Sequence, residues 1–149
     1  MTTSSVSAPR APARTGSAPT VFYDGSCGLC HRAVRFVAAR DRAARFRFAP
    51  LGGATFRERV PPAERDALPD SLVVATPDGR LLTRASGTRY LMNAVGGPWP
   101  LLASLSRVVP VSWLDRLYDL VARTRHRLFR RPEQNCPLLP PELRERFED

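Results

Sequence analysis

Two cysteines separated by two residues are the strongest chemical signal in the sequence. Cys27 and Cys30 follow the segment Asp24-Gly25-Ser26, and the third cysteine, Cys136, lies far along the chain. Three cysteines are too few, and odd in number, for a disulfide framework that holds a small protein together. A close cysteine pair in a chain with no recognisable export signal is typical of redox or metal chemistry.

The elements expected around this pair give each cysteine a role. Residues 20–23 are β-branched and aromatic and predict a short buried strand, and Ser26 is a suitable N-cap for a helix over 27–40. Unpaired amides and the helix dipole favour a thiolate in the first turn. We therefore expect Cys27 to be the attacking nucleophile and the more exposed cysteine. Cys30, one turn later and nearer the core, would resolve the mixed disulfide.

Asp24 has two interpretations. It could accept the proton from Cys30 as that thiol attacks, which is a general-base role. It could instead organise the Asp24-Gly25 turn, as short acidic side chains often do. The sequence leaves both roles open.

The rest of the chain predicts one α/β domain over 20–149 with a helical extension at about 98–131 and a tail after it. Residues 1–19 are rich in Ala, Pro, Ser and Arg and predict a disordered tail. A Pro77-Asp78-Gly79 turn predicts a hairpin. Further strands are expected at 45–49, 71–75 and 81–83, and further helices at 54–59, 63–68, 86–95 (capped by Ser86), 101–109 and 113–131.

The motif Tyr23-Asp24-Gly25-x-Cys27-x-x-Cys30 resembles the signature of the DCC family, which is named after one aspartate and two cysteines. The resemblance covers roughly Val21 to Phe147 and includes the Asp78-Gly79 hairpin and the arginine-rich helix. It implies a thioredoxin-like β-α-β…β-β-α core and a thiol–disulfide oxidoreductase. The expected substrate is a disulfide-bearing protein or low-molecular-weight thiol, with an unidentified reductant and no cofactor or metal.

Two other hypotheses, a haem attachment site and a zinc site, use the same residues. Cys27-x-x-Cys30-His31 matches the attachment pattern of c-type haem, but haem is attached outside the cytoplasm and no export signal is recognisable. Zinc could be held by the three cysteines with His31 or His126, yet Cys136 has no ligand partner close in sequence. Cys136 could also be a third redox cysteine, although we favour a packing role in its loop.

The charge suggests a different class of function. The net charge is +9, and every basic residue is arginine. Aromatic residues are not interleaved with the arginines, which argues against nucleic-acid binding.

Residues 90–106 are uncharged but are interrupted by glycine and proline, so no membrane span is expected and a cytoplasmic location is predicted. The arginine-rich amphipathic stretch over 113–131, which includes Arg125, is favoured as a solvated charged face with its apolar side on the core. It leaves an alternative function, in which a thioredoxin-like adaptor docks on a partner or on anionic membrane. Its cysteines would then be redox-sensing or structural.

Overall fold

The computed structural model describes residues 18–69, 71–128 and 145–148 of the chain. The predicted tail over 1–19 lies outside the described residues except for Ala18 and Pro19. Cys136 also lies outside them, as does the side chain of His126.

A four-stranded mixed sheet forms the centre of the domain, with strand order β2-β1-β3-β4. β1 (Thr20–Tyr23) pairs in parallel with β2 (Arg47–Pro50), which confirms the predicted β-α-β crossover. β1 also pairs antiparallel with β3 (Val73–Ala75), and β3 pairs antiparallel with β4 (Leu81–Thr83) across the predicted hairpin. This mixed α/β architecture is consistent with a thioredoxin-like fold.

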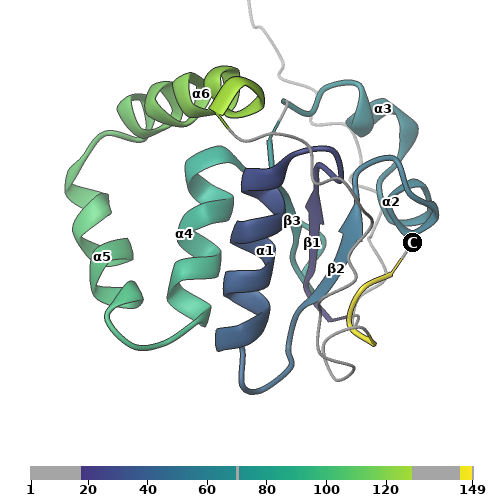
Figure 1. Cartoon of the computed structure of the whole chain (residues 1–149), viewed down its shortest axis with the longest axis horizontal. Coiled ribbons are helices and arrows are strands. Elements are labelled where there is room, and N and C mark those ends of the chain that lie inside the picture. The colour runs from purple at the N-terminus through teal and green to yellow at the C-terminus, as the bar shows by residue number, and fades with distance from the viewer. Residues whose placement is uncertain (1–17, 70, 129–144, 149) are drawn as a thin grey trace, which may run out of the picture.

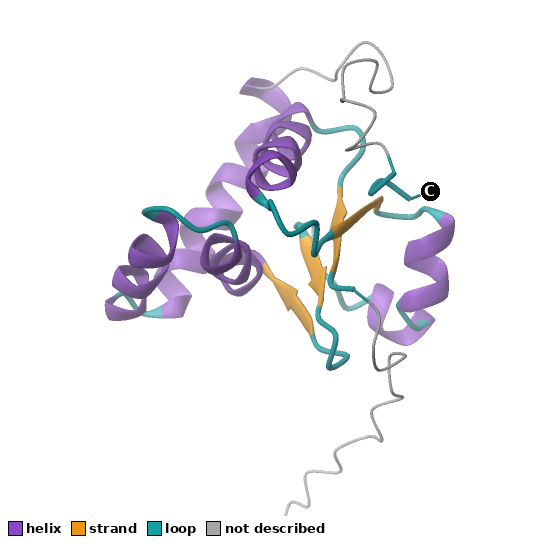
Figure 2. Ribbon diagram, turned by 90° about the horizontal axis from the view of Figure 1, so that it is seen from below, coloured by secondary structure: helices purple, strands orange, loops and turns teal. Residues whose placement is uncertain are grey.

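Helices cover both faces of the sheet (Figures 1 and 2). On one face, α1 (Gly28–Arg40) and α4 (Arg84–Ala94) pack over a core that includes Val21 and Tyr23. On the other face, α2 (Ala54–Arg59) and α3 (Pro62–Arg65) lie near the cluster that includes Phe22. Successive residues of β1 thus enter different cores, because side chains alternate along a strand.

The C-terminal extension consists of α5 (Trp99–Leu105), a short 3₁₀ helix η1 (Ser106–Val108) and α6 (Val111–Leu128). α5 packs beside α4, and α6 crosses α4 and the start of α1 along the upper edge of the view in Figure 1. None of the described helices is long and apolar enough to cross a membrane.

Several predicted boundaries are shifted by one to three residues, and three of them lie at helix caps or at the start of a strand. α1 has Cys27 rather than Ser26 as its N-cap, since the Ser26 hydroxyl donates to Asp24. α4 begins at Arg84 directly after β4, so Thr83 rather than Ser86 is its N-cap. β3 begins two residues later than expected, and the amide of Leu72 before it donates to the Tyr118 hydroxyl at 3.0 Å.

Candidate active site

The turn that leads from β1 into α1 is built around the carboxylate of Asp24. Asp24 Oδ1 accepts hydrogen bonds from the Ser26 amide at 2.8 Å and from the Ser26 hydroxyl at 2.6 Å. The Asp24 carbonyl accepts the Cys27 amide at 3.2 Å. These bonds fix the backbone that delivers Cys27 to the N-terminus of α1.

The cysteine pair is buried at this end of α1. Both are free thiols; Cys27 is 0% exposed and Cys30 is 7% exposed. The expectation that Cys27 is the more exposed of the two is therefore wrong. The physical reason is that Cys27 belongs to the hydrophobic core cluster that also includes Tyr23 and Val34.

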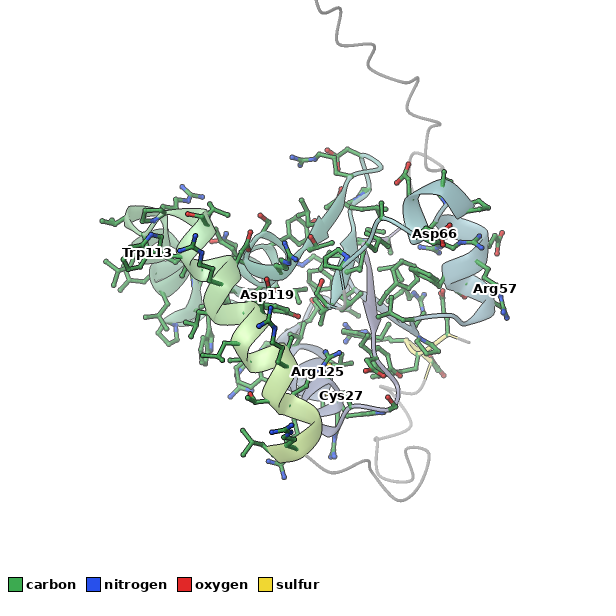
Figure 3. All side chains as sticks on the ribbon, turned by 90° about the horizontal axis from the view of Figure 1, so that it is seen from above. Cys27, Arg57, Asp66, Trp113, Asp119 and Arg125 are labelled. Carbon is green, nitrogen blue, oxygen red and sulfur yellow. The ribbon has the colours of Figure 1, made fainter. Side chains whose placement is uncertain are left out.

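Arg125 of α6 connects the acidic turn with the cysteine pair. Its Nη1 lies 3.2 Å from Cys30 Sγ, and its Nη2 lies 3.3 Å from Asp24 Oδ2. The Arg125 side chain is only 3% exposed, so solvent screens its charge weakly. In Figure 3 the labelled Arg125 and Cys27 lie near each other where α6 passes over α1. The site therefore combines two cysteines and an aspartate from one motif with an arginine from the far end of the domain.

The surroundings of Cys30 keep its thiol protonated. Burial is the largest cause that raises the pKa of Cys30, from 9.0 to about 12, followed by the hydrogen bond and the charge of Cys27. The Arg125 charge and the Asp24 backbone act in the opposite direction and lower this pKa. Cys30 is thus a weak nucleophile while the Cys27 sulfur beside it is free.

An apolar cavity of about 340 Å³ adjoins the pair between α1, α4, α5 and α6. Cys30 and Arg125 lie in its wall, with Phe36, Leu91 and Trp99 among the apolar residues. Cavities of this size are typical of small-ligand sites. An apolar group could therefore reach the Cys30 side of the pair.

His31, which the haem and zinc hypotheses both use, lies in the first turn of α1 beside the cysteine pair. His31 is half-buried, its Nε2 lies 2.9 Å from the Gly25 carbonyl, and its ring packs edge-on against Tyr23. Across residues 18–69, 71–128 and 145–148, no three His, Cys, Asp or Glu side chains are grouped so that they could hold a metal ion. Ligand sets that need Cys136 or His126 lie outside the described positions.

Sequence reasoning missed Arg125 because it assigned the whole arginine-rich stretch to a solvated face. A signal was present, since Tyr118, Ala122 and Arg125 are spaced by four and three residues and share one side of the helix. Tyr118 and Ala122 border the cavity together with Arg125. An arginine placed in register with core-facing residues is a candidate for a buried charged contact.

Comparisons with known proteins identify the family of the chain. Residues 21–131 match the family of DCC1-like thiol-disulfide oxidoreductases. The chain is 29% identical over 131 residues to the uncharacterized protein YuxK of Bacillus subtilis, covering 85% of this chain and 91% of that protein. It is also 29% identical over 120 residues to the chloroplastic DCC family protein At1g52590 of Arabidopsis thaliana, covering 80% of this chain and 69% of that one. No solved structure matches the chain significantly.

The family match spans the motif, the sheet and α6, and so includes Asp24, both cysteines and Arg125. The protein belongs to the DCC1-like thiol-disulfide oxidoreductase family.

Proposed function

We propose that the protein exchanges its Cys27–Cys30 dithiol with the disulfide of a protein or of a low-molecular-weight thiol. The observation that carries this proposal is the unequal environment of the two sulfurs. Cys27 occupies the N-cap of α1, whereas Cys30 retains its proton and lies 3.2 Å from a guanidinium nitrogen of Arg125. Such a difference between neighbouring titratable groups supports separate chemical roles.

In the first step, the Cys27 thiolate attacks one sulfur of the substrate disulfide. A bond forms between Cys27 and that sulfur, the substrate S–S bond breaks, and the other sulfur leaves as a thiolate. Cys27 is the N-cap residue of α1, next to first-turn amides that have no acceptor within the helix.

In the second step, Cys30 loses its proton and attacks Cys27 Sγ. The mixed disulfide breaks, the second substrate sulfur leaves as a thiolate, and the Cys27–Cys30 disulfide forms. Once Cys27 is in a mixed disulfide, its charge no longer raises the pKa of Cys30, while Arg125 still stabilises the emerging thiolate. Asp24 holds Arg125 through its ion pair, and we keep Asp24 as the candidate acceptor of the Cys30 proton.

The complete reaction moves two electrons from the dithiol to the substrate disulfide, with two protons. A cellular thiol reductant must then return the pair to the dithiol, and we place this cycle in the cytoplasm, where reduced thiol pools are maintained. Because both thiols are buried, α6 or the Asp24 turn has to move before a bulky disulfide can reach Cys27.

A redox titration against glutathione tests the proposal, with alkylation and mass mapping at each point. A Cys136→Ser background removes the third thiol. We expect Cys27 and Cys30 to form one disulfide reversibly, Cys27→Ser to abolish reaction with a disulfide substrate, and Cys30→Ser to accumulate the mixed disulfide. If Cys27 and Cys30 never form a disulfide with each other, exchange chemistry is excluded and the adaptor hypothesis takes its place.

A further inference from the structure

Large exposed apolar side chains are concentrated in the C-terminal extension. Within the described part of the chain, every one of them lies in the stretch from Leu101 to Leu128. They are Leu101, Leu102, Leu105, Val108, Val109, Val111, Trp113, Leu117, Leu120, Val121 and Leu128. Exposed apolar patches of this extent mark sites of interaction with proteins or membranes.

Four of these exposed apolar residues lie where α5 passes through η1 into α6. Val108 is 81% exposed and Trp113 is 68% exposed, with Leu105 and Val111 beside them in sequence. Figure 1 shows this junction at an outer corner of the molecule, away from the sheet. A protruding apolar tip that carries a tryptophan suits the boundary between lipid headgroups and acyl chains, where the amphipathic indole ring is favoured.

The charges of this surface are arranged to present cations. Arg107, Arg116, Arg123 and Arg127 are exposed around the apolar residues. The two acidic residues of α6 face the body of the domain instead. Asp115 Oδ1 accepts the Ala85 amide at 3.2 Å, and Asp119 Oδ1 lies 3.1 Å from Arg84 Nε.

The two kinds of side chain form adjoining stripes along α6. Residues three, four or seven positions apart share one face of a helix. The apolar stripe includes Trp113, Leu117 and Leu120. The neighbouring stripe includes Arg116, Arg123 and Arg127. An apolar stripe bordered by arginines is the pattern of helices that lie in the interface of an anionic bilayer.

We propose that the surface formed by α5, η1 and α6 docks on a bilayer containing anionic phospholipid. The apolar tip over 105–113 enters the headgroup boundary, and the exposed arginines contact the phosphate groups. Charge complementarity favours an anionic bilayer as the partner of this surface. The surface presents exposed arginines, while its acidic residues are bound to α4.

Vesicle flotation of the full chain tests this proposal, with phosphatidylcholine vesicles that contain or lack phosphatidylglycerol. We expect flotation with the anionic vesicles alone and its loss at high salt. Arg116→Gln with Arg123→Gln should lower the partition coefficient about thirtyfold, since each basic residue near an anionic surface contributes about 1 kcal/mol. Arg42→Gln with Arg57→Gln is the matched control, because both arginines are exposed elsewhere and the net charge changes equally.

Trp113 gives a local readout in a Trp99→Phe background, where it is the remaining tryptophan. Its emission should shift to the blue when anionic vesicles are added. The proposal is overturned if the protein floats with neither vesicle, if both double variants lose binding equally, or if Trp113 emission stays unchanged during flotation. Flotation of Cys27→Ser should equal that of the unaltered protein, which separates docking from the redox chemistry.

Discussion

Replacing Arg125 with glutamine should slow the resolving step far more than the first attack. The change removes the guanidinium that lies 3.2 Å from Cys30 Sγ and 3.3 Å from Asp24 Oδ2. Because Cys30 must become a thiolate only in the second step, the lost stabilisation falls on that step. The first attack depends on Cys27, the N-cap residue of α1, whereas the guanidinium lies against Cys30 and Asp24.

The size of the effect follows from the geometry. Unit charges 3.2 Å apart interact by about 5 kcal/mol at an effective dielectric constant of about 20. The Asp24 carboxylate offsets part of this attraction, so a hydrogen bond to a charged group, about 1.5–3 kcal/mol, is the better measure. This corresponds to a rise of about 1–2 units in the pKa of Cys30. A thiolate whose thiol has a higher pKa is also more nucleophilic, and this gain offsets nearly half of the loss in thiolate fraction on a logarithmic scale. The resolving step should therefore be about three- to tenfold slower.

The assay is a single turnover with a glutathione-linked peptide disulfide, quenched by acid and followed by mass analysis of the mixed disulfide. In Arg125→Gln the mixed disulfide should persist about three- to tenfold longer, and the pH midpoint of its resolution should move upward. Arg125→Lys should restore part of the rate, because it retains the charge without the planar fork. Arg123→Gln, an exposed neighbour in α6, should resolve at the normal rate. An unchanged rate and pH profile in Arg125→Gln would refute the assigned role.

Three further changes address stability. Between pH 9 and 12 the melting temperature should fall, because the unfolded Cys30 thiol ionises near 9.0 while the folded thiol holds its proton to about 12. In Cys30→Ala the melting temperature should fall less over this range. An equal fall in the variant and in the unaltered protein would contradict the prediction. Asp41→Ala should cost about 3–5 kcal/mol in urea denaturation, because it leaves the buried Arg146 charge unpaired; a loss typical of a surface site would argue against it. Gly87→Ala should cost about 1–3 kcal/mol by the same measurement, because the added Cβ would lie 3.0 Å from the Leu82 carbonyl oxygen. Normal stability would show that α4 can shift away from β4.

Local patterns predicted most of the fold. The β1 strand at residues 20–23 and the α2 helix at 54–59 have the boundaries expected from the sequence, and the Pro77-Asp78-Gly79 turn joins β3 to β4. In each case the signal is carried by neighbouring residues. Boundaries failed where a distant or competing group intervened, as when the Tyr118 hydroxyl took the Leu72 amide. Such partners are specified by tertiary packing, which periodicity does not describe.

The site was predictable only in part for the same reason. Cys27 and Cys30 form a local motif, so their pairing and their place at a helix N-terminus follow from the sequence. The burial of Cys27 depends on tertiary packing in the core, and the contact of Arg125 with Cys30 depends on where α6 packs, 95 residues along the chain. Reading Arg125 as a solvated charge was wrong because one arginine of that stretch belongs to the inner face of α6.

The C-terminal part of the chain completes both ends of the helix that carries the cysteines. Arg125 pairs with Asp24 in the turn before α1, and Arg146 pairs with Asp41, the C-cap residue after it. Arg146 also donates to the Ala38 carbonyl at 3.3 Å, which satisfies an acceptor in the last turn. Each pair joins residues about a hundred positions apart, 101 for Arg125 and 105 for Arg146. The position of α1, and with it the geometry of the cysteine pair, therefore depends on α6 and on the C-terminal segment that carries Arg146. Neither segment belongs to the cysteine motif.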